Sequence, residues 1–303
     1  FDGLNTWTNP TADEDELPVT TNIELHKVGR GGEGGEVIVG AKSLDQGIPV
    51  ITVDVLGDDS KPSNVQKIDT TDEALEEIYI STHADYVDGD SFASLTIRED
   101  FDSTPELVDA DDFYGDLTLG STGNLFTNIE TVTATGGGDV AFYADYTDDD
   151  GFPSLSANAF TVTTAGGRDT INVDVNDGAQ VTVTTGAVND RITASVDGSD
   201  DSGSTASTIE INSASGNNTI TLSSTETREA DVTTGSGTDT VTGGGTDLTA
   251  STGGGNDVIY AENTGTKAVA TLANAASLWD TAVNVTNGAD NYAMTWSQFL
   301  NGR

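Results

Sequence analysis

Hydrophobic and polar residues alternate in short runs over most of the chain. Between residues 21 and 118 these runs are rich in β-branched side chains and read IELHKV, GEVIVGA, IPVITVDVLG, EEIYIST and ASLTIRE. In the second half the alternation is strict, with apolar residues at Ile171, Val173, Val175, Val181, Val183, Ile209, Ile211, Ile220 and Leu222. A period of two predicts β-strands that bury one face. The chain is therefore expected to be mainly β.

An acid or amide recurs two positions before an apolar residue in the second half of the chain. The pairs are Asp169/Ile171, Asp190/Ile192, Asn218/Ile220, Asp239/Val241 and Asp257/Ile259, with steps of 21, 28, 21 and 18 residues. Asp139, in ATGGGDVAF, suggests an earlier and less regular copy. A repeat of this length with turn residues at one phase is typical of a coiled, stacked architecture. We therefore predict a parallel β-solenoid or β-roll over residues 116–262.

The remaining chain divides into three parts around this solenoid. Residues 1–20 are polar and interrupted by proline, as in a tail or linker, and residues 21–115 form an N-terminal β domain with acid-rich loops. In residues 263–303, the stretch KAVATLANAASLWD has apolar residues at helical spacing. We expect a small helical or mixed C-terminal cap over the open end of the solenoid. The aromatic tail with Tyr292, Trp296 and Phe299 suits either a buried cap or an assembly contact.

The repeat is densest in residues 234–260, TGSGTDTVTGGGTDLTASTGGGNDVIY. Glycine permits the positive φ of a tight turn and leaves carbonyl groups exposed, and aspartate adds a carboxylate. Calcium binds about six to eight such oxygens. Stacked turns would bring these groups together, so the sequence predicts calcium sites between coils of about 18 residues. The alternative is that turns prefer glycine, asparagine and aspartate for conformational reasons alone. Three copies of Gly-x-Gly-x-Asp lie in phase here, namely Gly235, Gly237 and Asp239; Gly243, Gly245 and Asp247; and Gly253, Gly255 and Asp257.

The segments STGGGNDVIY (251–260) and TGSGTDTVTG (234–243) resemble the nonapeptide repeats of RTX proteins, which are secreted, bind calcium and form parallel β-rolls. FTNIETVTATGGGDV (126–140) and the composition of residues 116–262 are similar to calcium-dependent S-layer proteins of Gram-negative bacteria and to type I-secreted adhesins. Asp169 and Asp190 match only in part, because Ala165 and Val188 each replace a glycine of the motif, and they are further candidate metal ligands. The resemblance implies that the metal ligands are Asp239, Asp247 and Asp257 with the carbonyl groups of Gly235, Gly237, Gly243, Gly245, Gly253 and Gly255.

The charge balance limits the partners that the chain can bind. Its 51 acidic residues against 11 Lys and Arg give a formal net charge of −40. Such a charge opposes compaction and association until cations neutralise it, which fits a calcium-binding protein. Nucleic acid and anionic membranes are bound by clustered Lys and Arg, so neither is expected as a partner, and no apolar run is long enough to insert into a membrane. Adaptation to high salt would also explain the acids, but not the phase of the glycines.

Residue types that carry most enzyme chemistry are sparse. There is no cysteine, and the two histidines, His26 and His83, lie outside any H-E-x-x-H motif. Neither a G-x-S-x-G elbow nor a P-loop is present. A carboxylate-pair glycosidase would depend on a geometry that sequence does not define, and a lyase acting on an acidic polymer would need more basic residues. We therefore expect no enzymatic activity. His83 beside Asp85 is a weaker candidate for a metal contact.

The expected function is that of an extracellular structural protein at a bacterial cell surface. It would self-assemble into a surface layer or filament when calcium neutralises its acids, because an ion that binds only the folded form couples folding to ion concentration. The main alternative is an adhesin or carbohydrate-binding segment of a secreted RTX-type protein, with a surface polysaccharide as partner. The first residues, FDGLNTWTNPTADEDELP, do not form a signal peptide. The chain is then processed, is a fragment, or is exported without a cleaved leader.

Overall fold

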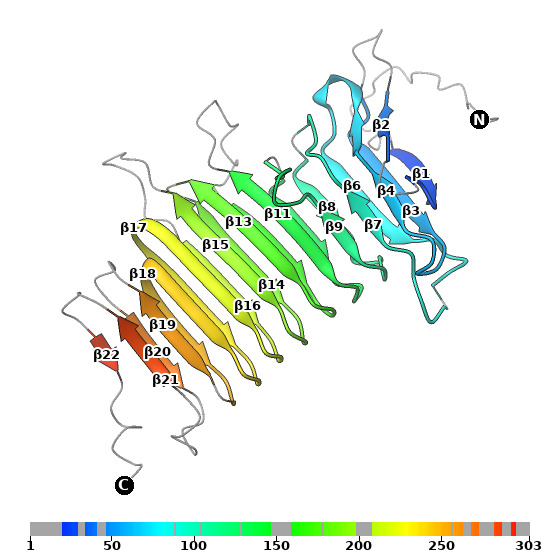
Figure 1. Ribbon diagram of the computed structural model, residues 1–303. Helices are drawn as coiled ribbons and strands as arrows, with labels where there is room; N and C mark the ends of the chain where they lie inside the picture. Colours follow the sequence, from blue (N-terminus) through cyan, green and yellow to red (C-terminus); the bar gives the residue numbers. More distant parts are fainter. Residues whose placement is uncertain are drawn as a thin grey trace, which may run out of the picture.

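The computed structural model is a parallel β-solenoid (Figure 1). It describes residues 20–29, 34–40, 47–87, 89–103, 105–127, 129–146, 159–176, 179–197, 208–255, 257–262, 268–272, 282–286 and 292–294. In these ranges every regular element is a β-strand except one 3₁₀ turn, Thr71–Glu73. All pairings between the described strands are parallel. The mainly β, solenoid-like fold expected from the alternating pattern is confirmed.

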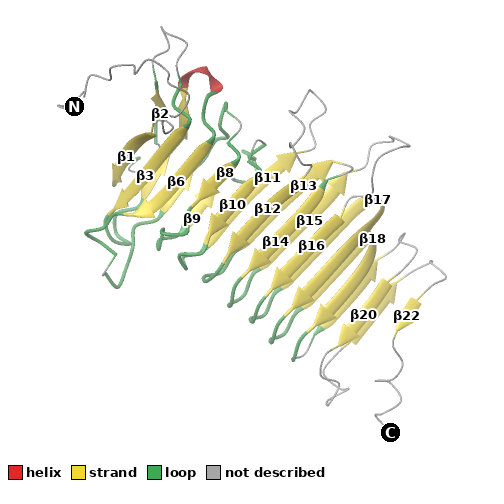
Figure 2. Ribbon diagram, turned by 180° about the vertical axis from the view of Figure 1, so that it is seen from behind, coloured by secondary structure: helices red, strands yellow, loops and turns green. Residues whose placement is uncertain are grey.

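Successive strands of the chain alternate between two ladders of parallel strands. The first ladder consists of β1 (Thr20–His26), β3 (Val50–Leu56), β6 (Glu77–Thr82), β8 (Leu107–Asp109), β10 (Thr131–Ala134), β12 (Ala159–Thr164), β14 (Gln180–Thr185), β16 (Thr208–Ser213), the later halves of β17 (Thr219–Thr234) and β18 (Thr240–Thr252), β20 (Ala268–Leu272) and β22 (Tyr292–Met294). This ladder lies toward the viewer in Figure 2.

The second ladder lies toward the viewer in Figure 1. It consists of β4 (Ser63–Val65), β7 (Leu95–Ile97), β9 (Leu117–Leu119), β11 (Val140–Tyr146), β13 (Thr170–Asn176), β15 (Arg191–Asp197), the first halves of β17 and β18, β19 (Val258–Glu262) and β21 (Ala282–Thr286). A separate two-stranded sheet of β2 (Glu36–Val39) and β5 (Lys67–Thr70) is present only in the first coils.

The two ladders enclose one continuous hydrophobic core. Strand β11 shows the strict alternation of buried and partly exposed residues that the sequence predicts. Because the strands are in register, each inward side chain stacks on its equivalent in the next coil. Phe142 lies in register with Ile171, and Ile171 with Ile192. The buried cluster extends from Leu25 to Ile259. The core and the sheet therefore continue without a break at the domain boundary expected near residue 115.

The described residues of the C-terminal segment, for which a helical or mixed cap is expected, form strands. Residues 268–272 form strand β20, which pairs in register with β18. The last coil offers unpaired backbone groups, and pairing with them outweighs the weak helical preference of an alanine-rich segment. The rest of the 267–280 stretch lies outside the described residues. Of the tail aromatics, Trp296, Phe299 and the side chain of Tyr292 lie outside them as well.

The short turns between the first and second ladders line up along one edge of the solenoid (Figures 1 and 2). At one position of each turn the backbone has a positive φ, and glycine occupies it in four of the five turns from residue 165 onward. A Cβ atom on Gly237 or Gly255 would lie 1.8 or 1.4 Å from a carbonyl oxygen of the neighbouring coil. The fifth turn has Val188, which is 45% exposed at a φ of 103°. The glycines at this position of the other four turns are Gly167, Gly216, Gly237 and Gly255.

Replacing Val188 by glycine is expected to stabilise the protein. A β-branched residue at this φ carries strain of about 1–3 kcal/mol, whereas glycine adopts it freely at a smaller cost in chain entropy. The exposed valine side chain buries little surface that would be lost. We expect Val188→Gly to raise the free energy of unfolding by about 1 kcal/mol, measured from urea midpoints.

The matched control is Ala187→Gly in the same turn. Ala187 is exposed and is not among the residues with positive φ, so glycine there only increases the entropy of the unfolded chain. This variant should lose about 0.5–1 kcal/mol. If Val188→Gly and Ala187→Gly destabilised the protein equally, strain at residue 188 would be refuted.

The stacked turn edge as candidate functional site

The acids and amide of the sequence repeat form one buried column on the edge with the short turns. The pairing of the strands that follow them places Asp169, Asp190, Asn218, Asp239 and Asp257 one above another. Each of these side chains is at most 2% exposed. We call these five residues the inner column. The structure therefore brings together four of the predicted metal ligands, Asp169, Asp190, Asp239 and Asp257.

Each inner-column side chain accepts a hydrogen bond from the backbone of the preceding coil. The Oδ1 atom of Asp169 accepts from the N–H of Val140 at 3.0 Å, and Oδ1 of Asp190 accepts from the N–H of Asp169 at 3.1 Å. Asn218, Asp239 and Asp257 repeat the contact at 3.0, 2.9 and 3.0 Å. An amide serves as well as a carboxylate here, because only an acceptor oxygen is needed. The inner column thus joins successive coils.

A column of buried hydroxyl groups lies beside the inner column. It consists of Thr164, Thr185, Ser213, Thr234 and Thr252, each at most 4% exposed. The hydroxyl of Thr164 donates to Oδ2 of Asp169. Thr185 donates to Ser213 at 3.0 Å, and Ser213 in turn donates to Oδ2 of Asp190 at 3.4 Å.

The hydroxyl and the acid appear together along the solenoid. In the preceding coil the equivalent positions are both apolar. Ala134 lies opposite Thr164, and Val140 lies opposite Asp169, directly before the paired residues of β11 and β13. A buried carboxylate needs donors for both oxygens, and at Asp169 and Asp190 a hydroxyl of the neighbouring column supplies the second. This coupled change identifies the pair as one structural unit.

An outer column lies one residue before the inner one and points its hydrogen bonds the opposite way. Asp116 accepts from the N–H of Asp139 at 2.9 Å, and Asp139 accepts from the N–H of Arg168 at 2.7 Å. Asn189 and Asn217 make the same contact to the next coil, both at 2.7 Å. Asp139 therefore does not occupy the position expected for an earlier copy of the repeat, because Val140 stands there instead.

Burial disfavours the charged form of the inner-column acids. Loss of hydration raises the pKa of Asp169 to about 7, although the hydroxyl of Thr164 and the N–H of Val140 partly oppose this effect. Burial also raises the pKa values of Asp190 and Asp239, and this effect is partly opposed by hydroxyl and backbone donors at Asp190 and by the N–H of Asn218 at Asp239. Neighbouring acids act in the same direction as burial at each of the three. The column therefore favours protons or other cations.

The oxygen atoms available for calcium on this edge are few. One oxygen of each inner-column acid already accepts a backbone N–H. Three buried polar atoms in neighbouring coils have no hydrogen-bond partner, namely Oδ2 of Asp239 and the hydroxyls of Thr234 and Thr252. Calcium requires about six to eight oxygens, so these atoms fit one part of a site. Among the described residues there is no group of three or more His, Cys, Asp or Glu that could hold a metal.

The middle of the three Gly-x-Gly-x-Asp copies, with Gly243, Gly245 and Asp247, lies away from the other two. Residues 240–244 belong to the second ladder and residues 246–251 pair within the first, so Gly245 and Asp247 fall on the side of the coil opposite the short turns. This placement agrees with a step of half a coil. Gly243 is buried, and a Cβ there would meet the side chain of Leu248 at 2.8 Å. The backbone of Asp247 is in register with Glu229.

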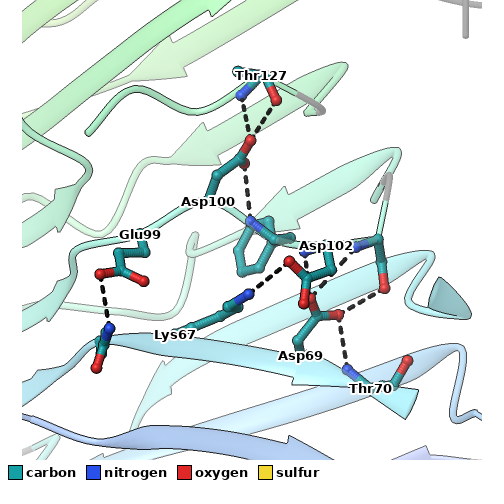
Figure 3. A network of polar contacts seen from close by, with 10 residues as sticks. Lys67, Asp69, Thr70, Glu99, Asp100, Asp102 and Thr127 are labelled. Atoms are coloured by element: carbon teal, nitrogen blue, oxygen red, sulfur yellow. Dashed lines mark hydrogen bonds and ion pairs between the residues drawn. The ribbon is translucent and has the colours of Figure 1, made fainter. Parts of the chain in front are cut away.

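A second buried polar cluster, which no sequence pattern indicates, lies in the first coils (Figure 3). Asp69 is fully buried and accepts hydrogen bonds from the N–H groups of Thr70 at 2.8 Å and Asp102 at 2.5 Å, and from the hydroxyl of Ser103 at 2.6 Å. Lys67 forms an ion pair with Asp102 at 2.6 Å. These contacts fix the segment 99–103 against β5. The contacts of Asp69 and Lys67 with the segment 99–103 join residues more than 30 positions apart in sequence, which is why local patterns miss them.

Asp100 fixes the other side of the same segment. It accepts from the N–H of Thr127 at 3.0 Å and also from its hydroxyl, and burial raises its pKa to about 6. The weaker metal candidate elsewhere, His83, accepts through Nδ1 from the N–H of Asp85 at 3.2 Å. The contacts of Asp100 and those of His83 thus both hold loops in place.

Asp169 should make the protein less stable as the pH rises. The folded state retains its proton up to about pH 7, whereas an unfolded aspartate releases it near 3.9. The folded state therefore binds more protons between about pH 4 and 7, and the free energy of unfolding falls over this window. Asn218 shows that an amide fits the column. We expect Asp169→Asn to be more stable than wild type at pH 8, by roughly 2–4 kcal/mol, with little difference at pH 4.5.

Urea midpoints measured in EDTA at constant ionic strength test this expectation. The difference between variant and wild type isolates residue 169 from the general effect of the net charge. Asp174→Asn, at a partly exposed strand position, is the control for removing one charge. An identical pH slope for wild type and Asp169→Asn would contradict the expectation.

No helix among the described residues is long and apolar enough to cross a membrane. No family model, no curated protein and no solved structure matches the chain. A function can therefore be inferred only from the residues of this chain and their geometry.

Proposed function

We propose that this chain is an extracellular structural protein of a bacterial surface, which self-assembles into a layer or filament with calcium as its counter-ion. The observation that supports the structural role most directly is the solenoid itself. In-register ladders extend from β1 to β22, and a single core extends from Leu25 to Ile259. Such a body is stiff along its length, because neighbouring coils are joined by backbone hydrogen bonds and by the core, and between residues 116 and 257 also by the side-chain columns.

The calcium part of the proposal rests on the charge and on the turn edge. A net charge of −40 opposes contact between copies until cations neutralise it. The inner column buries carboxylates one above another, and near Asp239 it leaves a carboxylate oxygen and two hydroxyls without partners. Asp239 and Asp257, with the carbonyl groups of Gly235, Gly237, Gly253 and Gly255, are the residues that would hold the ion on this edge. Bound calcium would supply positive charge to this column. Asp247, with Gly243 and Gly245, would serve the opposite side of the coil.

The alternative is that the solenoid is a segment of an adhesin or of a carbohydrate-binding protein. The partly exposed aromatic side chains of the N-terminal coils favour it. The ring centroids of Phe92 and Tyr114 are 5.4 Å apart, and Tyr114 is 36% exposed. Aromatic faces of this kind can stack on sugar rings. A protein of this class would stay monomeric in calcium and bind a surface polysaccharide.

Light scattering during a calcium titration tests self-assembly. We expect particles to grow at millimolar calcium and to dissolve again when EGTA is added. Magnesium at the same concentration is the control, because it neutralises charge with the same valence but demands a smaller octahedral site. A wild-type chain that stays monomeric throughout would refute self-assembly and favour the adhesin alternative.

Asparagine substitutions test whether the inner column binds the ion. Asp239→Asn combined with Asp257→Asn keeps both acceptor oxygens, as Asn218 does, but removes both charges. In EDTA the double variant should be at least as stable as wild type. Calcium should raise the urea midpoint of the wild type and leave that of the double variant nearly unchanged.

Asp247→Asn is the companion variant for the opposite side of the coil. If it alone abolishes the calcium response, the ion binds there. An undiminished response in both variants would remove these aspartates from the list of ligands.

A further inference from the structure

Acidic residues are unevenly distributed over the two outer faces of the solenoid. On the second ladder, one outward position per strand forms a column in register from Asn64 on β4 to Val258 on β19. Each member is partly or fully exposed. The column contains no acid over nine strands, and its one charge is Arg191. Threonine occupies five of its positions, Thr96, Thr118, Thr170, Thr219 and Thr240.

A second column lies two residues farther along the same strands. It runs from Tyr143 on β11 to Tyr260 on β19 and contains no charged residue. Between the two tyrosines lie Asn172, Thr193, Thr221 and Thr242. We call these two adjacent columns the threonine strip. Acids flank the strip on both sides. Asp145, Asp174 and Glu262 lie in a third column beyond it and Asp197 in the next, whereas Asp116 and Asp139 of the outer column lie on its other side.

The first ladder carries acids near both of its ends. Glu24 and Asp54 are register partners in the first coils, and Glu210 and Asp231 are register partners farther along. Glu229 and Asp247 also oppose each other on adjacent strands. Like charges directly opposite each other destabilise a sheet, so this face gains most from added cations.

In a chain with 51 acids, a long strip without any is the place where a second polyanion can approach. We propose that the threonine strip is the contact between two copies of this chain, packed sheet against sheet. This inference rests on the proposed self-assembly and names the surface that performs it. Hydroxyl and amide side chains both donate and accept, so a copy of the strip offers complementary partners. No described strand covers this face.

The size of the strip predicts a weak contact. Nine strands at a spacing of about 4.8 Å give a length of roughly 40 Å, and two columns give a width of about 13 Å. The strip would then bury roughly 400–500 Å² on each copy, which is below the usual size of a stable dimer interface. Such a contact suits a lattice, in which many weak contacts act together.

The test is to place acids on the strip and compare them with acids on the other face. Thr221 and Thr242 are register partners on the strip, and Thr163 and Thr184 are register partners on the first ladder. All four side chains are partly exposed, and none has an acid as a register partner on the next strand. The double variants T221E/T242E and T163E/T184E therefore add the same charge in similar local surroundings. Sedimentation velocity over a concentration series in calcium measures association of each full-length chain.

We expect T221E/T242E to raise the concentration needed for association by at least about tenfold, since like charges that meet in an interface are strongly unfavourable. The T163E/T184E control should stay within about twofold of wild type. Circular dichroism checks the fold, and the single variant T219E at an exposed strip position replaces the pair if folding is impaired.

Equal effects of the two double variants, or no effect of either, would overturn the strip as the contact while self-assembly itself stands. A wild-type chain that is monomeric under all conditions would overturn both. Affinity electrophoresis in dextran probes the other occupant of the face. If a monomeric wild type is retarded by dextran and T221E/T242E is not, the strip binds a neutral glycan and the second-copy inference is overturned.

Discussion

The parallel register between successive coils is the constraint on which this structure depends. Each residue lies about 4.8 Å from its equivalent in the next coil, so like side chains stack on like. For Ile171 and Ile192 this stacking builds the core. For Asp169 and Asp190 it brings two buried carboxylates together, which is unfavourable unless donors or cations compensate. The backbone N–H groups of the turns and the neighbouring hydroxyls supply those donors. The same register that stacks the buried carboxylates of the turn edge thus also brings them their hydrogen-bond donors.

The positions of these residues could be predicted from sequence, but their contacts could not. Alternation at Ile171, Val173 and Val175 gives strand and inward face, and the recurrence of an acid two residues earlier gives the column. The spacing is the same, however, whether a carboxylate turns toward carbonyl groups and a metal or toward the N–H of the preceding coil. That choice depends on the partner at the next coil and on buried hydroxyls such as Thr164, whose role appears only when Ala134 is seen in the equivalent place.

Two other features were beyond a local pattern for different reasons. The stretch 268–272 has helical spacing, yet it pairs with β18, because an open sheet edge is a stronger influence than local preference. Asp69 and Asp100 are buried by partners more than 25 residues away, and nothing nearby in sequence distinguishes them from surface acids. The sequence pattern places Asp139 one residue away from the inner column, and a shift of one residue gives a side chain a different partner.

The separation of acids from the threonine strip divides assembly into two physical steps. Repulsion between the acidic faces acts over about 8–10 Å, and any cation that screens or binds those acids weakens it. The contact itself acts only at atomic distance and involves residues without charge. Cations would then permit association without forming part of the interface. Calcium dependence of assembly alone would not locate a calcium site, because neutralising the first ladder is sufficient. A specific site on the turn edge must instead appear in the stability of the single folded chain, where the asparagine substitutions and the native Asn218 provide the comparison.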